Sequence, residues 1–309
     1  MKKWLMIVNP SSASSATAET WVESKRVLMA GGLDVDDVLT KYRGHAAELA
    51  REAAAGGCRN FIAVGGDGTI HEVMTGLLRY SDESGVSMGE FTLGVLPYGT
   101  GNDWIRTAGI SADMNEAAAA IVRGRTGLED VVRLTLPTGT FCMANIGGVG
   151  LDADVCVRTN ALKAKGYRGG ILYKLMTAVA IFAKKPGKVQ IVCDGETVYE
   201  GKLFSAVIAN GIYRGGGVAQ NADGTGWDDG ILDVSIMPGV GKLKAVLLMT
   251  HALTGDFAVQ KGIITRRFRR MDVVPLGGVP DNVESDGEVP GQLPLTVELT
   301  GQQINIIVP

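Results

Sequence analysis

The chain has 309 residues, 46% of them apolar, and this length exceeds the roughly 100 to 200 residues of one domain, so we expect two domains with separate cores. Its 30 basic and 33 acidic residues leave a formal net charge of −3, which excludes a general attraction for DNA or RNA. The four cysteines and three histidines are scattered and predict neither a zinc site nor disulfides.

The first 130 residues alternate short apolar runs with helical patterns. The first run, residues 4–8, is too short for the core of a signal peptide and ends at Asn9-Pro10, so we interpret it as a buried strand and expect a cytoplasmic protein. Strand and helix patterns then alternate at residues 17–30, 35–39, 45–55, 61–64, 70–78, 91–96 and 115–123. This alternation predicts an α/β fold in which residues 1–130 form a doubly wound parallel sheet.

From residue 131 to residue 309 the pattern changes. Short β-branched runs separated by glycines lie at residues 131–136, 141–146, 189–193, 204–209, 232–236 and 295–299. They predict a C-terminal antiparallel β-sandwich domain, and a return of the last residues to the first domain stays open. Two apolar helical patterns interrupt the runs at residues 171–183 and 242–253. The first contains Lys174 and falls short of the roughly 20 residues that span a bilayer, so we expect a soluble protein.

Two glycine-rich loops each follow an apolar run and open a helical pattern. They are Gly65-Gly66-Asp67-Gly68-Thr69 and the segment 97–103, with Gly99, Thr100, Gly101, Asn102 and Asp103. Glycines let the backbone approach an anion, and the amides of a following helix attract its charge. The loops predict a nucleotide-binding domain, with Mg²⁺ between the phosphates and the carboxylates of Asp67 and Asp103. The alternative is that they are only the tight turns of a doubly wound sheet.

Four ordered blocks and a closing tripeptide carry a family resemblance. They lie at residues 65–73, 93–103, 145–155, 210–233 and 286–288, the last being Asp286-Gly287-Glu288. On these motifs the chain resembles the bacterial diacylglycerol kinase family, which is related to sphingosine kinases and more distantly to NAD kinases. The resemblance covers nearly the whole chain. It implies an ATP- and Mg-dependent lipid kinase that converts diacylglycerol to phosphatidic acid, with residues 131–309 as the lipid-substrate domain.

The resemblance also implies where ATP binds. The nucleotide-binding residues it implies, all on loops or first helical turns after strands, are Asn9, Thr40, Gly65, Gly66, Asp67, Gly68, Thr69, Glu72, Gly99, Thr100 and Asn102. Ala13 stands where the family usually has a glycine, which predicts a weaker contact with phosphate.

A second, structural ion is implied by the resemblance of residues 226–231 to a family loop. Its ligands would be the Asp229 carboxylate and the main-chain carbonyls of Gly226 and Ile231, and such oxygen ligands suit Mg²⁺ or Ca²⁺. The alternative is a β-turn with solvated acids.

The implied catalytic residues are Glu288, Asp286 and Asp103. Glu288 would be the general base that takes the proton of the lipid hydroxyl, with Asp286 assisting and Asp103 on the magnesium side. On an extended segment, residues 286 and 288 would point to the same side. The alternative is a surface turn.

The expected partner is a lipid at a membrane surface, with no nucleic acid. In the family context the apolar helix 171–183 would line a groove for the lipid, with side chains such as Leu175 and Phe182, and the basic run 266–270 would touch anionic headgroups. The alternatives are a buried core helix at residues 171–183 and a solvated strand edge at residues 266–270. Uncovered sandwich edges leave a homodimer open. Two other functions also stay open, an NAD kinase and a nucleotide- or lipid-binding module without turnover.

Overall fold

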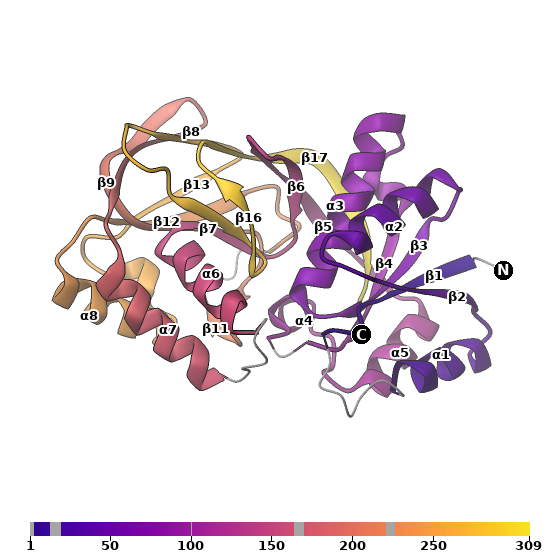
Figure 1. The fold of residues 1–309 in the computed structure, drawn as a ribbon. Helices are drawn as coiled ribbons and strands as arrows, with labels where there is room; N and C mark the ends of the chain where they lie inside the picture. Colours follow the sequence, from indigo (N-terminus) through magenta and orange to yellow (C-terminus); the bar gives the residue numbers. More distant parts are fainter. Residues whose placement is uncertain (1–2, 13–19, 100, 164–169, 221–225) are drawn as a thin grey trace. The chain divides into compact units, whose positions relative to one another are not determined.

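The structure is a computed structural model that describes residues 3–12, 20–99, 101–163, 170–220 and 226–309 (Figure 1). The chain divides into two compact units. The first unit comprises Met1–Val131 and Thr300–Pro309, and the second comprises Val132–Leu299.

The first unit is built on a parallel sheet with the strand order β17-β4-β3-β1-β2. The strands are β1 (Lys3–Val8), β2 (Asp34–Leu39), β3 (Asn60–Gly65), β4 (Thr92–Pro97) and the end of β17 (Leu295–Ile307). The central strand β3 is buried along its whole length, and its apolar residues 61–64 are fully enclosed. Such a continuous apolar run is typical of a parallel strand with helices on both faces.

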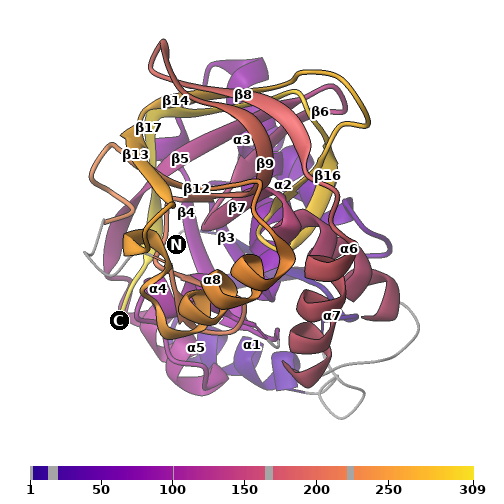
Figure 2. The same ribbon diagram turned by 90° about the vertical axis from the view of Figure 1, so that its left-hand side faces the viewer.

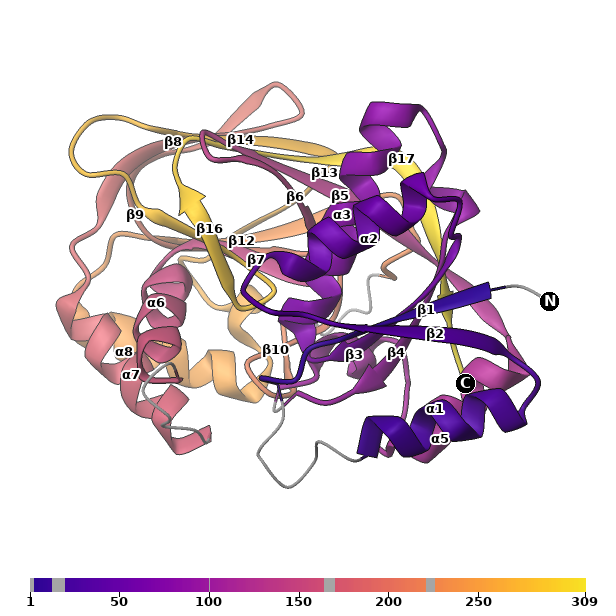
Figure 3. The ribbon, with the colours of Figure 1, turned by 45° about the vertical axis from the view of Figure 1, so that its right-hand side comes forward.

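The helices of the first unit cover both faces of this sheet. They are α1 (Thr20–Ala30), α2 (His45–Ala55), α3 (Asp67–Ser84), α4 (Asp103–Thr107), α5 (Met114–Arg123) and the short η2 (Met88–Glu90). Figure 3 shows α2 and α3 packed together on one face and α1 and α5 packed together on the other. Gly76 allows the close approach of α2 and α3, because a Cβ there would lie 2.2 Å from the carbonyl oxygen of Ala47. The predicted doubly wound parallel sheet is confirmed.

The second unit consists mainly of antiparallel strands, which confirms the predicted change of architecture. Its main path runs β16-β15-β7-β9-β8-β14, and β12 pairs with both β9 and β13. The strands are β5 (Thr126–Leu136), which begins in the first unit, β6 (Gly139–Met143), β7 (Ile146–Gly150), β8 (Gly187–Cys193), β9 (Glu196–Ala209), β10 (Tyr213–Arg214), β11 (Val218–Ala219), β12 (Leu232–Pro238), β13 (Ile264–Phe268), β14 (Arg270–Pro275), β15 (Asn282–Ser285) and β16 (Glu288–Gln292).

Three helices lie together beside these strands, as Figure 2 shows. They are α6 (Leu151–Lys163), α7 (Gly170–Ala183) and α8 (Lys242–Thr254), which is followed by η3 (Phe257–Val259). They share a small core with β9 and β12, in which Phe204 and Met237 are fully buried. Among the described residues, none of the helices combines the length and the apolar character needed to cross a membrane.

Candidate active site

Four loops of the first unit begin at one edge of its sheet, at the carboxyl ends of β1, β2, β3 and β4. These strands are parallel neighbours, so the loops that follow them converge. The backbone N–H of Asn9 donates to Val64 at 2.9 Å, that of Tyr98 donates to Gly65 at 2.8 Å, and that of Thr40 donates to the last residue of β1 at 2.8 Å. The loops predicted to bind a nucleotide therefore start side by side.

The two glycine-rich loops touch through their backbones. A Cβ on Gly99 would lie 2.5 Å from Cα of Gly66 and 2.7 Å from Oδ1 of Asn102, and a Cβ on Gly66 would lie 3.0 Å from Cα of Gly99. Side chains at either position would push the loops apart, so glycine is needed here for close approach. Thr100, between these residues in sequence, lies outside the described residues, as does Ala13.

The carboxylates of Asp67 and Asp103 lie together beside the second loop. A Cβ on Gly101 would be 3.1 Å from Oδ2 of Asp67 and 3.7 Å from Oδ2 of Asp103. The other oxygen of Asp67 accepts a hydrogen bond from the backbone N–H of Trp104 at 2.9 Å, which caps the first turn of α4. The structure thus brings both predicted magnesium-side carboxylates to one place.

Asn102 has a left-handed backbone and a buried side-chain oxygen. Its φ is 52°, and its Oδ1 has no hydrogen-bond partner among the residues that the structure describes. Buried polar atoms of this kind normally have a partner, which a protein group, a water or a ligand supplies. This oxygen lies beside the second glycine loop, because a Cβ on Gly99 would be 2.7 Å from it.

Asn9 and Thr69 link the turn after β1 to the first turn of α3. Asn9 Nδ2 donates to Thr69 Oγ1 at 3.1 Å. A Cβ on Gly65 would lie 2.1 Å from the same hydroxyl oxygen, so this glycine gives Thr69 its place. Gly68 precedes Thr69 in the first turn of α3, whose N-terminal amides open toward the glycine loops.

Glu72 has both carboxylate oxygens engaged with another helix. Oε1 accepts from the backbone N–H of Gly44 at 2.8 Å and Oε2 accepts from that of Ala46 at 3.1 Å. Glu72 belongs to α3, and its carboxylate lies at the N-terminal end of α2, whose own cap residue Gly44 supplies no side-chain hydrogen bond. Glu72 therefore holds the loop after β2 against α3, a structural role that the sequence did not predict.

The sequence analysis did not predict the buried carboxylate of Glu129, which contacts a residue of α4. Glu129 has 0% of its surface exposed, and both its oxygens lie 3.2 Å from Nε1 of Trp104, which donates to them. The sequence signal for it is the pair Glu129-Asp130 directly before the apolar pair Val131-Val132. Such a carboxylate supports the helix that carries Asp103.

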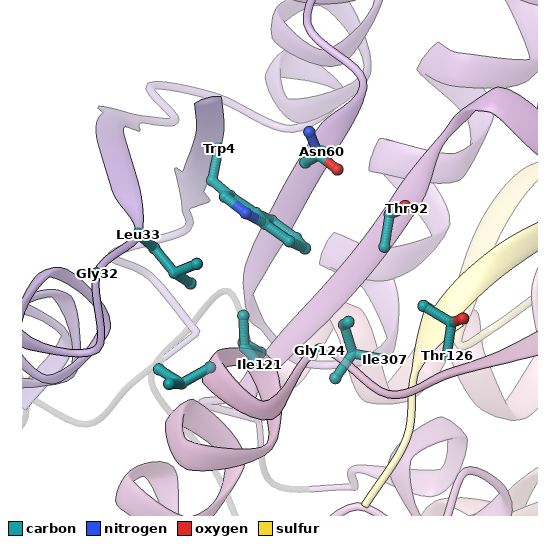
Figure 4. A pocket seen from close by; sticks show the side chains of 10 residues that line it. Trp4, Gly32, Leu33, Asn60, Thr92, Ile121, Gly124, Thr126 and Ile307 are labelled. Carbon is teal, nitrogen blue, oxygen red and sulfur yellow. The ribbon is translucent and has the colours of Figure 1, made fainter. Parts of the chain in front are cut away.

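A cavity of about 290 Å³ lies elsewhere in the first unit (Figure 4). Trp4, Asn60 and Thr92, at the amino ends of β1, β3 and β4, line it together with Ile121 and Ile307. This is the opposite end of the strands from the glycine loops. The cavity therefore contains none of the predicted site residues.

In the second unit, residues 286–288 form a tight hairpin turn. Asp286 and Gly287 have φ values of 52° and 83°, and they connect β15 to β16, where Ser285 pairs with Glu288. The expectation of an extended segment is wrong, because Asp-Gly is a preferred pair for a two-residue turn with positive φ at both positions.

The Asp286 carboxylate is occupied by backbone amides. Oδ1 accepts from the N–H of Asn145 at 2.8 Å and of Ile146 at 3.3 Å, and Oδ2 accepts from Ala144 at 2.9 Å. The carbonyl of Asn145 in turn accepts from the N–H groups of Asn210 and Gly211 at 2.9 and 2.8 Å. The motifs around residues 145, 210 and 286 thus meet, with Asp286 holding the turn in place.

Glu288 is the first residue of β16 and is half-buried. The turn before it is fixed by α6, because Asn160 Nδ2 donates to the carbonyl oxygen of Gly287 at 3.0 Å. Glu288 therefore follows a turn that is held by both Asp286 and Asn160.

A second buried acid, Glu284, lies beside this turn, and the sequence analysis did not predict it either. Glu284 Oε2 accepts from the N–H of Gly287 at 3.2 Å. Burial, together with the nearby carboxylates of Asp152 and Asp286, holds the pKa of Glu284 well above its ordinary value. Asp152 itself is paired with Arg214 and accepts from the Ser205 hydroxyl.

The loop predicted to hold a structural ion forms a turn. The backbone N–H of Ile231 donates to Asp229 Oδ1 at 3.1 Å, and that of Asp229 donates to Gly226 at 3.4 Å. Within the part of the chain that the structure describes, no three His, Cys, Asp or Glu side chains gather closely enough to hold a metal ion.

Comparison with known proteins gives the class of this fold and site. The diacylglycerol kinase catalytic domain matches residues 3–134, and the YegS C-terminal NAD kinase beta sandwich-like domain matches residues 146–308. The chain belongs to the lipid kinase family that these two domains define, and it is a lipid kinase.

Individual relatives agree with this assignment. The chain is 28% identical to a probable lipid kinase YegS-like of Xanthomonas campestris pv. campestris (strain 8004), covering 99% of this chain and 96% of the relative. It is also 28% identical to the diacylglycerol kinase of Bacillus subtilis (strain 168), covering 100% and 97%. A solved structure of a putative diacylglycerol kinase from Bacillus anthracis str. Sterne superposes with a TM-score of 0.78 at 25% identity, covering 100% and 97%.

Proposed function

We propose that this lipid kinase transfers the γ-phosphate of ATP to the free hydroxyl of diacylglycerol and releases phosphatidic acid. The observation that supports it most is the backbone contact between Gly66 and Gly99 beside the carboxylates of Asp67 and Asp103. The name of the Bacillus subtilis relative supports diacylglycerol as the acceptor.

In this proposal the first unit binds and orients the nucleotide. The phosphates lie against the glycine loops, where Gly66 and Gly99 carry no side chain, and the amides at the start of α3 donate to them. Asn102 Oδ1, which is buried and has no partner within the described residues, accepts a hydrogen bond from the bound nucleotide or its water. Asn9 and Thr69 fix the neighbouring turn through their 3.1 Å hydrogen bond.

Asp67 and Asp103 would hold Mg²⁺, which neutralises the charge of the transferred phosphoryl group when bound. Two carboxylates fit this ion, because Mg²⁺ usually takes one or two protein carboxylates and completes its shell with phosphate oxygens and water.

The second unit supplies the base in this proposal. Glu288 takes the proton of the lipid hydroxyl as that oxygen bonds to the γ-phosphorus and the bond to ADP breaks. Asp286 acts through position, because its oxygens already accept three amides, and it keeps Glu288 at the end of a fixed turn. A carboxylate is a weak base for an alcohol, so most of the rate comes from positioning and charge neutralisation.

The test is a kinase assay with purified protein, labelled ATP, Mg²⁺ and mixed micelles containing diacylglycerol. We expect labelled phosphatidic acid, and we expect Glu288→Ala to lower kcat by about 10²- to 10⁴-fold with ATP affinity unchanged. Glu196→Ala, which removes an exposed carboxylate in the same unit, is the control. The proposal fails if no phosphatidic acid forms or if Glu288→Ala is fully active.

The same assay with NAD in place of the lipid separates the alternative. The second unit matches a domain described as NAD kinase beta sandwich-like, so NAD is a specific competitor as acceptor. Phosphorylation of NAD but not of diacylglycerol would assign the activity to NAD.

A further inference from the structure

The outward sides of α7 and α8 carry large apolar side chains. Those of α7 recur at the i, i+4, i+7 spacing of a single helical stripe. The exposed members of both helices and of the following η3 are Leu175, Val179, Phe182, Leu243, Val246, Leu247 and Val259. Phe182 is 63% exposed and Leu243 is 85% exposed. The expectation from sequence placed the first helix along a groove, whereas the structure turns Leu175 and Phe182 outward.

The opposite sides of the same helices are apolar as well, and these sides are already packed. Ala180 and Ile181 of α7, with Ala245 and Leu248 of α8, are buried in the small core around Phe204. A helix on a water-exposed surface has one apolar and one polar side, whereas a helix that is apolar all round is covered by something. The outward sides of α7 and α8 therefore lack a partner within the described chain.

The two outward sides adjoin one another. Lys242 Nζ, at the start of α8, donates to the carbonyl oxygens of Ile181 and Lys184, at and just after the end of α7. Figures 1 and 2 both show the two helices side by side. Phe182 and Leu243 belong to the turns that this lysine joins, so the apolar side chains form one surface, here called the α7–α8 face.

The charge around the α7–α8 face is positive, although the whole chain has a net charge of −3. Residues 170–185 contain three lysines and no acid, and residues 242–261 contain three lysines and one acid, Asp256. Of these lysines, Lys184 is buried and ion-paired with Asp154 and Asp281, so it adds no free charge. That acid is bonded to His251 and Gln260 at 2.9 and 3.0 Å. Lys185, Lys244 and Lys261 are exposed at the border of the face.

The basic run 266–270 was expected from sequence to contact lipid headgroups. Some of its arginines are paired with acids, which reduces its free positive charge. Arg270 is ion-paired with Asp272 and Glu298 at 3.1 and 2.7 Å, and Arg267 is 3.5 Å from Asp233. Its strands also present no comparable group of exposed apolar side chains among the described residues. The α7–α8 face combines both properties.

We propose that the α7–α8 face docks the enzyme on an anionic lipid bilayer, with the apolar side chains inserted among the acyl chains and the lysines at the headgroups. An exposed apolar surface rimmed by cations is what an interfacial helix presents to such a membrane. This inference rests on the proposed function at one point: a lipid acceptor lies in the bilayer, so the enzyme must reach the bilayer to phosphorylate it.

A second copy of the chain fits this face less well. In a twofold dimer the same surface meets itself, so the lysines around each face would lie near like charges. An anionic bilayer removes this repulsion and covers the same apolar area.

The face is also connected to the proposed base within the second unit. Helix α6 packs against α7 and against β15 and β16. Its Asn160 holds the carbonyl of Gly287, next to Glu288. Helix α6 therefore contacts both a helix of the α7–α8 face and the turn that precedes the proposed base Glu288.

The test measures sedimentation of the full chain with vesicles of phosphatidylcholine and phosphatidylglycerol that contain no diacylglycerol. The double variant Phe182→Glu/Leu247→Glu removes apolar area and adds negative charge, and we expect its vesicle affinity to fall about tenfold or more. Val279→Glu, at an apolar residue that is 84% exposed outside the face, should bind like the unmodified chain. Lys244→Glu/Lys261→Glu should lose binding to phosphatidylglycerol. Lys188→Glu, at an exposed lysine of β8, is the control and should keep it.

Activity on a water-soluble short-chain diacylglycerol separates this inference from the proposed function. The docking variants should keep that activity, while an enzyme that binds vesicles yet phosphorylates no diacylglycerol would refute only the proposed function. Equal vesicle binding by the unmodified chain and the Phe182→Glu/Leu247→Glu variant would overturn the inference. So would a dimer, seen in sedimentation velocity, that this variant dissociates, because it would assign the face to a second copy.

Discussion

The Oδ1 atom of Asp286 accepts a hydrogen bond from the backbone N–H of Asn145 at 2.8 Å, across a separation of 141 residues. It is one of three amide contacts to this carboxylate, and it joins the hairpin that precedes Glu288 to the segment that begins β7. The position of the proposed base Glu288 thus depends on a neighbouring acid whose oxygens accept three backbone amides and the Ser285 hydroxyl.

Replacement of Asp286 should affect stability and turnover together. Asp286→Ala leaves three buried N–H groups without their acceptor, and since each such loss costs about 1 to 3 kcal/mol, we expect the free energy of unfolding to fall by about 3 kcal/mol or more. Asp286→Asn keeps one acceptor oxygen and should lose less.

Urea unfolding and steady-state kinetics check this prediction. The kcat should fall in both variants while KM for ATP stays constant, because Asp286 belongs to the unit that supplies the base. Glu196→Ala serves as the control at an exposed acid. Unchanged stability in Asp286→Ala would show that the amide contacts contribute nothing.

Gly99→Ala should weaken nucleotide binding. The new Cβ would lie 2.5 Å from Cα of Gly66, so the two loops must separate and the phosphate cradle must widen. We expect KM for ATP to rise about tenfold or more, since loss of a few phosphate contacts exceeds 1.4 kcal/mol.

The matched control is Gly89→Ala in the same unit, where the nearest atom to a Cβ is 3.5 Å away. Isothermal titration with ATP measures both variants. If Gly99→Ala and Gly89→Ala bind ATP equally, the loops do not form the nucleotide site.

The first unit could be predicted well from sequence because its signals are local. The apolar run 61–64 followed by Gly65-Gly66 indicates a buried parallel strand and a tight turn, and the structure has both. Once the strands are known to be parallel neighbours, the loops after them are expected at the same edge of the sheet.

The contacts of the buried acids could not be predicted in this way. The sequence around Asp286 does not indicate that its carboxylate accepts hydrogen bonds from residues 144–146, because strand pairing over such sequence separations is set by the whole fold. Glu129 and Glu284 each stand next to apolar residues, which shows burial at most and not the group that faces them. The outward direction of Phe182 was hidden for a different reason, since α7 is apolar on all sides and has no polar stripe to orient it.

Glu72 should matter for the stability of the first unit. Glu72→Ala removes the acceptor for the N–H groups of Gly44 and Ala46, and loss of such a cap costs about 0.5 to 2 kcal/mol. The loop that carries Thr40 is then less fixed, so KM for ATP should rise modestly. Thermal unfolding against Glu52→Ala, an exposed acid on α2 itself, checks the effect. A Glu72→Ala protein as stable as Glu52→Ala would contradict it.

The raised pKa of Glu284 predicts how stability depends on pH. Its ordinary value is 4.5, and burial with Asp152 and Asp286 nearby raises the folded value well above this. Between these two values the folded state holds a proton that the unfolded state has lost, so stability is fully present below the unfolded pKa and declines as pH rises toward the folded pKa. The decline from this group is at most about 1.4 kcal/mol per pH unit.

Glu284→Gln isolates this effect, because glutamine keeps an acceptor for the N–H of Gly287 and carries no charge. Urea unfolding from pH 4 upward, with phosphate and acetate buffers matched in ionic strength, should show two proteins of similar stability at the acid end. The variant should become progressively the more stable one as pH rises, because only the unmodified chain must either bury a charge or retain a proton. Parallel stability curves over the whole range would mean that Glu284 titrates alike in the folded and unfolded states, and that the acid cluster around Asp152 is open to solvent.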